Sequence, residues 1–178
     1  GIGPALSVTQ MRSMIRMALR FDASLDDIVT NLNNQLAADL SASRFITAIV
    51  GILDGTTHQF EYHAPGQGPL LFFKNKDQSH ESLSASTVPL GIVANAPLST
   101  PEPFNFETGD FLAVMSDGFF EYSNGSGELF GEDRVMAYLK ENQDQSAEAM
   151  ISGLVETIQE FAGDGVQDDD MTIFILKR

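Results

Sequence analysis

The sequence contains no cysteine, which excludes disulfide bonds, zinc–thiolate sites and thiol nucleophiles. It has no apolar run near the roughly 18 residues that a membrane helix needs, and no secretory signal pattern opens it. Positive charge is scarce, since 10 Lys and Arg face 25 Asp and Glu for a formal net charge of -15. DNA or RNA would therefore be repelled overall. We expect a cytoplasmic chain without a membrane span or a nucleic-acid partner.

The rest of the composition is that of an ordinary globular protein, with 43% hydrophobic and 20% charged residues. Its 178 residues contain no repeat, low-complexity tract or long linker, so we predict a single domain over residues 1–178. The negative charge has two readings, a soluble surface or a carboxylate cluster that binds cations, and only position along the chain can decide between them.

Hydrophobic periodicity predicts two amphipathic helices before any strand. The first carries Val8, Met11, Ile15 and Ala18 on one face, and the second begins at the N-cap Ser24. Strand patterns follow, and helices return after Gly131, the longer one starting near Ser146. A final strand closes the chain. Strands clustered between helix pairs predict an α+β layered domain, not alternating βαβ units.

Three local predictions can be checked directly. The nearly continuous apolar run from Phe45 to Leu53 predicts a buried strand. Asp54-Gly55 predicts a hairpin turn. The histidines fall in predicted strands or loops without partners, so we interpret them as surface residues: His58, His63 and His80.

Two acidic motifs carry the chemistry. In the first, an apolar strand ends at Met115 and is followed by Ser116-Asp117-Gly118, so the strand holds a carboxylate rigidly. In the second, Asp168-Asp169-Asp170 directly precedes the last strand, and a divalent cation is one way to offset the repulsion of three carboxylates. If the two strands are neighbours, both motifs can share a site. Oxygen ligands of this kind suit magnesium or manganese.

Each motif also has a plainer explanation. Asp-Gly pairs are turn formers, as at Asp54-Gly55, and an aspartate triplet in a loop is commonly a solvated surface. The glycine-rich stretch from Ala64 to Pro69 lacks the lysine and following helix of a P-loop. Neither acidic motif by itself establishes a function.

The order and spacing of motifs along nearly the whole chain resemble the metal-dependent protein phosphatase (PPM) superfamily, in its stage II sporulation protein E branch. The two acidic motifs, Ser116-Asp117-Gly118-Phe119-Phe120-Glu121 and Asp169-Asp170-Met171-Thr172, are the specific ones. Other segments support the alignment: Arg44-Phe45-Ile46-Thr47-Ala48, Ala64-Pro65-Gly66-Gln67-Gly68-Pro69, Val88-Pro89-Leu90-Gly91-Ile92, Thr108-Gly109-Asp110 and Glu128-Leu129-Phe130-Gly131. Gln67 stands where the family often has histidine, in a loop that is not a metal site.

This resemblance implies an α–β–β–α sandwich and a two-metal centre of Mn²⁺ or Mg²⁺. Asp117 and Asp169 would be metal ligands, with Asp170 and Asp168 as further candidates. Metal-bound water would be the nucleophile, so no side chain forms a covalent intermediate. The substrate would be phosphoserine or phosphothreonine on a partner protein, in this branch typically an anti-sigma-factor antagonist in a bacterial sigma-factor switch.

The resemblance also implies that this chain is incomplete. The family has another metal aspartate just before the first helix, whereas Gly1-Ile2-Gly3-Pro4 looks like the tail of that motif. We therefore expect the C-terminal greater part of a phosphatase domain, missing its first strands, preceded in the full protein by a sensor or receiver domain and inactive as a fragment. The two leading helices resemble the branch's regulatory pair, which contacts a sensor domain or forms a homodimer. The alternative function is a degenerate phosphatase fold that binds a regulatory partner without catalysis.

Overall fold

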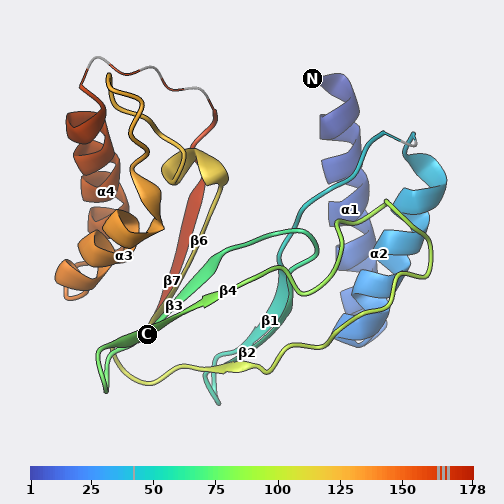
Figure 1. Ribbon diagram of the computed structural model, residues 1–178. Coiled ribbons are helices and arrows are strands. Elements are labelled where there is room, and N and C mark those ends of the chain that lie inside the picture. The colour runs from blue at the N-terminus through green and yellow to red at the C-terminus, as the bar shows by residue number, and fades with distance from the viewer. Residues whose placement is uncertain (42, 164, 166, 168) are drawn as a thin grey trace. The chain divides into compact units, whose positions relative to one another are not determined.

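The computed structural model describes residues 1–41, 43–163, 165, 167 and 169–178. Its helices are α1 (Ile2–Arg20), α2 (Leu25–Asp39), α3 (Gly131–Glu141) and α4 (Ala147–Ala162), with a short 3₁₀ helix η1 (Asp117–Phe119). Its strands are β1 (Val50–Asp54), β2 (Gln59–His63), β3 (Leu70–Lys74), β4 (Ser79–Leu83), β5 (Phe104–Asn105), β6 (Phe111–Met115) and β7 (Ile173–Lys177). Figure 1 shows these elements in chain order. This mixture of helices and antiparallel strands confirms the predicted α+β class.

The chain divides into two compact units. The first comprises Gly1–Gln67 and Ala85–Asn105, and the second comprises Gly68–Ser84 and Phe106–Arg178. In the first unit, a three-stranded antiparallel sheet has the order β1-β2-β5, and α2 packs against β1 and β2. In the second, a four-stranded antiparallel sheet has the order β4-β3-β6-β7. Each unit thus pairs a sheet with helices.

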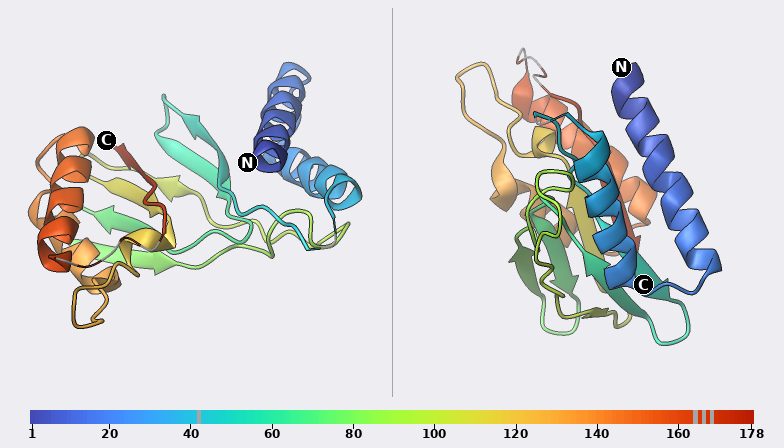
Figure 2. Two further views of the ribbon diagram at one scale, coloured as in Figure 1. Left: turned by 90° about the horizontal axis from the view of Figure 1, so that it is seen from above. Right: turned by 90° about the vertical axis from the view of Figure 1, so that its right-hand side faces the viewer.

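The core of the first unit lies under α2. Ser24 caps this helix as predicted, because its hydroxyl oxygen accepts a hydrogen bond from the Asp27 amide at 3.1 Å. The apolar stripe of the helix then packs with Val50 of β1 and with Leu90 in one cluster, whose buried members are Leu25, Ile28, Val29, Leu32, Leu36, Val50 and Leu90. The helix α1 lies beside α2 (Figure 2) and contains no fully buried residue.

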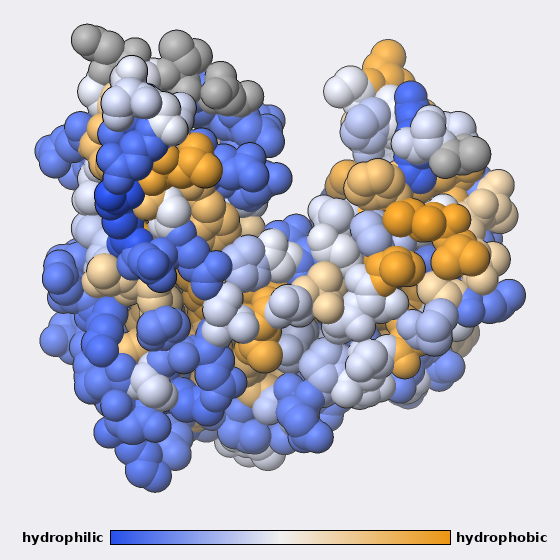
Figure 3. All heavy atoms as spheres, in the orientation of Figure 1, coloured by the Kyte–Doolittle hydropathy of each residue, from blue (hydrophilic) through white to orange (hydrophobic). Residues whose placement is uncertain are grey.

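The predicted buried strand from Phe45 to Leu53 is wrong in its extent and its burial. Only Val50–Asp54 forms β1, and after the buried Val50 its residues are exposed. Phe45 is 56% exposed and Ile46 makes an isolated bridge to Leu90. β1 pairs only with β2 among the described strands, so it is an edge strand, and an apolar run does not reveal whether neighbours cover both of its sides. Apolar side chains are accordingly visible on the surface of this unit (Figure 3).

The interpretation of His63 as a surface histidine is also wrong. Its side chain is fully buried at the end of β2, and its Nε2 atom lies 2.7 Å from Oδ1 of Asp26 on α2. Nδ1 of the same ring has no hydrogen-bond partner among the described residues. Burial of this histidine follows from the packing of α2 onto β2. His80 is exposed and His58 half-buried.

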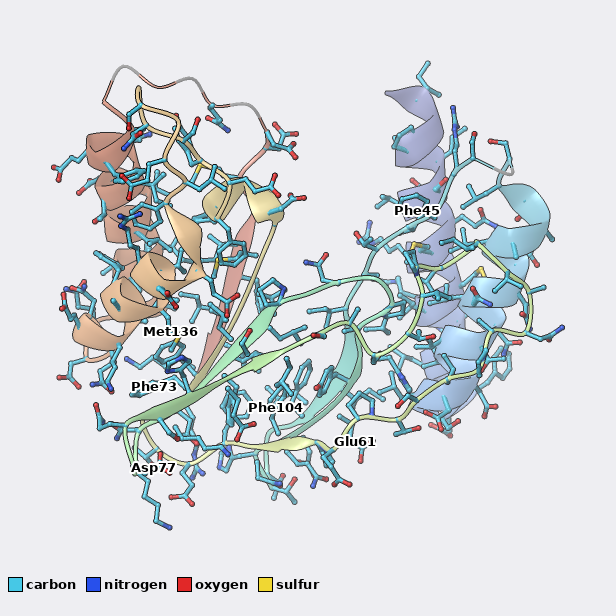
Figure 4. The ribbon with its side chains drawn as sticks, in the orientation of Figure 1. Phe45, Glu61, Phe73, Asp77, Phe104 and Met136 are labelled. Atoms are coloured by element: carbon cyan, nitrogen blue, oxygen red, sulfur yellow. The ribbon has the colours of Figure 1, made fainter. Side chains whose placement is uncertain are left out.

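The core of the second unit lies between the sheet and the helices α3 and α4. Buried side chains of β3, β6 and β7 pack against those of the two helices, as Phe73 and Met136 illustrate in Figure 4. Ser146 caps α4 as predicted, since its hydroxyl accepts a hydrogen bond from the Ala149 amide at 3.2 Å. No helix in the described part of the chain is both long and apolar enough to cross a membrane.

Candidate metal site

Asp117 lies where the central strand β6 ends. The strand is buried up to Met115, which is 2% exposed, and Phe119 is 1% exposed two residues beyond Asp117. The main-chain oxygen of Asp117 accepts hydrogen bonds from the amides of Phe120 at 2.8 Å and Glu121 at 2.9 Å, which closes the turn of η1. The backbone is therefore held on both sides while the Asp117 side chain is exposed.

The second acidic motif lies beside the first because β6 and β7 are antiparallel neighbours. Their register pairs Met115 with Ile173, and the Ser116 amide donates a hydrogen bond to the Thr172 carbonyl at 2.8 Å. The residues that follow β6 consequently run alongside those that precede β7. The two strands are therefore neighbours, which is the condition for a site shared by Asp117 and an aspartate of the second motif.

The Ser116 side chain joins the two motifs. Its hydroxyl donates a hydrogen bond to the main-chain oxygen of Asp170 at 2.9 Å and accepts one from the amide of Thr172 at 2.9 Å. Gly118 leaves room for the same segment, because a Cβ atom there would lie 2.6 Å from the Asp170 carbonyl oxygen. In the sequence, Ser116 and Gly118 are only parts of a motif, and no local pattern assigns them this contact.

The carboxylates of the candidate ligands differ in the hydrogen bonds that they accept. Asp169 Oδ1 accepts a hydrogen bond from the Asp170 amide at 2.7 Å. No hydrogen bond to the carboxylates of Asp117 or Asp170 comes from the described part of the chain, and both residues are exposed. Asp168 lies outside the described residues.

The other Asp-Gly pair shows the contrast. Asp54 Oδ1 accepts hydrogen bonds from the amides of Thr56 at 2.7 Å and Thr57 at 3.3 Å. These bonds to its charged form lower the pKa of the Asp54 carboxyl, that of Thr56 most. The Asp54 carboxylate is therefore used by its turn, as the plainer reading proposes, whereas the turn after Asp117 is closed by main-chain atoms.

A pocket of about 250 Å³ adjoins the acidic motifs within the second unit. Its lining consists of Gly118, Glu121, Tyr122, Leu129 and Asp169. The pocket thus combines two carboxylates with apolar surface from Leu129 and Tyr122. Leu129 was quoted in the sequence analysis only for alignment, because a lone leucine in a polar loop carries no local signal of a site.

The donor chemistry fits a hard divalent cation in kind. The carboxylate oxygens of Asp117 and Asp169 are the ligands that Mg²⁺ and Mn²⁺ prefer. In number the set is smaller than such ions need, since no three Asp, Glu or His side chains among the described residues are arranged to hold a metal ion. A metal at this place would need further ligands, from water, substrate or other residues.

Comparison with known proteins identifies the family. The family model of stage II sporulation protein E (SpoIIE) matches residues 1–178. The phosphoserine phosphatase RsbU of Bacillus subtilis is 26% identical over 181 residues, covering 99% of this chain and 53% of RsbU. The chain therefore spans about half the length of this curated relative.

Solved structures share the fold. The SiaA-PP2C domain of Pseudomonas aeruginosa superposes with a TM-score of 0.81 at 20% identity, covering 100% of this chain and 71% of that one. The PP2C phosphatase domain of SpoIIE from Bacillus subtilis, with a fragment of its regulatory domain, gives 0.75 at 16% identity, covering 98% and 49%. The RsbU and RsbW domains of Rv1364c from Mycobacterium tuberculosis give 0.72 at 21% identity, covering 100% and 48%. The predicted phosphatase-type fold is confirmed.

Proposed function

Because the chain belongs to the stage II sporulation protein E family, we propose that the protein containing it is a metal-dependent phosphoprotein phosphatase. One observation carries the proposal: Asp117 follows β6 and Asp169–Asp170 precede its neighbour β7, and the Ser116 hydroxyl bonds to the main chain of Asp170. Asp117 and Asp169 would hold a Mn²⁺ or Mg²⁺ ion, with Asp170 and Asp168 as further candidate ligands. When bound, such an ion supplies a water that is nucleophilic near neutral pH.

The chain's own residues would prepare the site for this ion. The end of β6 holds the main chain at Asp117, and the Ser116 hydrogen bonds to Asp170 and Thr172 hold the segment that follows Asp169, which reduces the conformational entropy to be lost on binding. The exposed Asp117 and Asp169 carboxylates can exchange water for a cation without unfolding of the core. Carboxylates attract a divalent cation and repel a bare phosphate group, so the metal must be in place before a phosphoester can approach.

The proposed substrate is phosphoserine or phosphothreonine on a regulatory protein, such as an anti-sigma-factor antagonist. RsbU carries the name phosphoserine phosphatase, and the RsbU-like domain of Rv1364c shares a chain with an RsbW domain. We further propose that a sensor or receiver domain of the full protein, or a homodimer, acts through α1 and α2. The proposed compartment is the cytoplasm, where protein kinases would form such phosphoesters.

Phosphate release by the full-length protein tests the proposal. The substrates are a phosphorylated protein and a generic small phosphoester, each with and without Mn²⁺. We expect release that depends on Mn²⁺ and that Asp117→Asn abolishes, because the amide lacks the negative charge with which a carboxylate holds a hard cation. Asp54→Asn is the matched control: it changes the other Asp-Gly pair, and its amide oxygen can still accept the turn's hydrogen bonds.

A second function has one observation in its favour. Since no three metal-binding side chains are grouped in the part of the chain that the structure describes, the fold could serve as a module that binds a regulatory partner without catalysis. Absence of phosphate release with every metal and substrate tried, combined with partner binding, would establish this alternative. Undiminished Mn²⁺-dependent release by Asp117→Asn would instead show that the metal ligands lie elsewhere.

A further inference from the structure

The loop after η1 holds an apolar side chain against the acidic motifs. Leu129 is 52% exposed and lines the pocket of about 250 Å³ together with Asp169, Glu121 and Tyr122. A large aliphatic side chain that is half open to water, next to two carboxylates, is not needed for the core of the unit. Singly exposed apolar side chains are common on protein surfaces, and what distinguishes Leu129 is that it lines a pocket together with Asp169 of the second acidic motif.

This loop is rigid by several independent contacts. The Phe130 amide donates to the Tyr122 carbonyl at 2.8 Å, and Ser123 forms an antiparallel bridge with Leu129. Asn124 Oδ1 accepts hydrogen bonds within the loop, from the Ser126 amide at 3.1 Å and the Glu128 amide at 3.0 Å. Leu129 is thus held on an ordered hairpin.

Arg134 fastens the same hairpin to the helices. Its guanidinium donates to the carbonyl oxygens of Leu129 at 2.9 Å and Phe130 at 3.1 Å, and pairs with the Glu128 carboxylate. The guanidinium carbon also lies 4.8 Å from the ring centroid of Phe161 on α4. A side chain presented by a braced loop loses little entropy when a partner covers it, which is how recognition residues achieve affinity.

The charges around the pocket determine what can cover Leu129. Glu121 is an exposed carboxylate and would repel an acidic side chain. The divalent cation that the proposed function assigns to Asp169 would repel a basic one. An uncharged apolar side chain meets neither penalty and gains contact with Leu129 and the Tyr122 ring. The pocket is large enough for one such side chain.

We propose that this pocket is a substrate subsite that receives an apolar side chain of the phosphorylated protein, close in sequence to its phosphoserine or phosphothreonine. The inference rests on the proposed phosphatase function, and it adds Leu129 as a specificity-determining residue. Substrates with a leucine near the phosphorylated residue should be preferred over those with alanine, lysine or glutamate at the same position.

The test uses the full-length protein with Mn²⁺ and four sets of phosphoserine peptides, in which each position within two residues of the phosphoserine is in turn Leu, Ala, Lys or Glu. At one of these positions we expect kcat/KM for the Leu peptide to exceed that for the Ala peptide about tenfold, the usual discrimination of an apolar pocket. In Leu129→Ala this ratio should fall to near one, whereas Leu129→Met should keep most of it. Leu53→Ala removes an aliphatic side chain of similar exposure, 47%, on β1 and should leave the ratio unchanged.

Binding supplies a readout that does not depend on turnover. Leu and Ala peptides with a non-hydrolysable phosphonate analogue of phosphoserine should show the same preference in fluorescence anisotropy. If the peptides are hydrolysed but the ratio of kcat/KM for the Leu peptide to that for the Ala peptide is the same in wild type and in Leu129→Ala, the subsite is overturned while the phosphatase function stands. A preference for Lys that Glu121→Gln removes would also overturn it. No hydrolysis of any phosphoester would defeat the proposed function itself.

Discussion

The Ser116 hydroxyl lies 2.9 Å from the main-chain oxygen of Asp170, although 54 residues separate the two in the sequence. The same hydroxyl accepts the Thr172 amide at 2.9 Å, so one side chain acts as donor and acceptor for the segment that carries Asp169 and Asp170. A hydroxyl can donate and accept at the same time, which is why Ser116 makes both bonds. The spacing between the two acidic motifs therefore depends on Ser116.

Removal of that hydroxyl should weaken metal binding more than it weakens the fold. Ser116→Ala leaves the Asp170 carbonyl and the Thr172 amide without a partner among the described residues. Loss of hydrogen bonds around metal ligands typically costs about tenfold or more in metal affinity. Isothermal titration of the full-length protein with Mn²⁺ measures the effect directly. Ser116→Thr, which keeps the hydroxyl, is the control. An unchanged Mn²⁺ affinity in Ser116→Ala would show that the Ser116 hydrogen bonds do not affect the metal site.

Gly118→Ala should destabilise the protein because the new Cβ atom would lie 2.6 Å from the Asp170 carbonyl oxygen. That neighbour is backbone and cannot rotate away, so the two motifs must move apart, at a cost of about 1–3 kcal/mol. Urea denaturation followed by circular dichroism gives the free energy of unfolding. Gly55→Ala, after the other Asp-Gly aspartate, adds a Cβ where no atom lies within 4 Å. Equal effects of the two substitutions would contradict the crowding at Gly118.

Asp26→Ala should lower stability although Asp26 is itself exposed. The substitution removes the oxygen 2.7 Å from His63 Nε2, and the fully buried ring would then have no partner at either nitrogen among the described residues. Leaving a buried donor unsatisfied costs about 1–3 kcal/mol. Asp26→Asn keeps an acceptor oxygen and should lose less.

Thermal unfolding of both Asp26 variants beside Glu102→Ala, another exposed carboxylate, provides the comparison. Glu102 has no ion-pair partner in the described part of the chain. If Asp26→Ala behaved like Glu102→Ala, the Asp26–His63 contact would contribute nothing to the packing of α2 on β2.

The pair of Glu128 and Arg134 should make the hairpin sensitive to acid. The hydrogen bond and positive charge of Arg134 lower the pKa of the Glu128 carboxyl. A carboxyl with a lowered folded-state pKa stabilises the fold above its ordinary pKa, and this stabilisation disappears as the pH falls through the lowered value. Wild type should therefore lose stability relative to Glu128→Gln as the pH drops below the ordinary carboxyl range. The effect should be small because both side chains are largely exposed.

Melting temperatures of wild type and Glu128→Gln from neutral to acidic pH test this expectation, and Glu102→Gln is the control. If the difference in melting temperature between wild type and Glu128→Gln stays constant across the pH range, the Glu128–Arg134 pair makes no pH-dependent contribution to stability. At high salt the difference should shrink, since the charges are screened.

Features that depend on neighbouring residues along the chain agree with the sequence analysis. The N-caps Ser24 and Ser146 and the turn at Asp54-Gly55 form as predicted, because each is a hydrogen bond between residues two or three positions apart. Burial is different. The exposed Phe45 and the buried His63 were both assigned wrongly, since burial depends on which elements pack on each face.

The candidate site likewise combines features that local sequence predicts with contacts that depend on packing. The sequence by itself determined the α+β class, the helix caps and the family, and it placed Asp117 after a buried strand and Asp169–Asp170 before another. Only the tertiary structure decided that Ser116 and Gly118 contact the Asp169–Asp170 segment, and that Leu129 and Glu121 share a pocket with Asp169. The physical reason is that antiparallel pairing of β6 with β7 joins residues far apart in the chain, and these contacts form only when the two strands pack together.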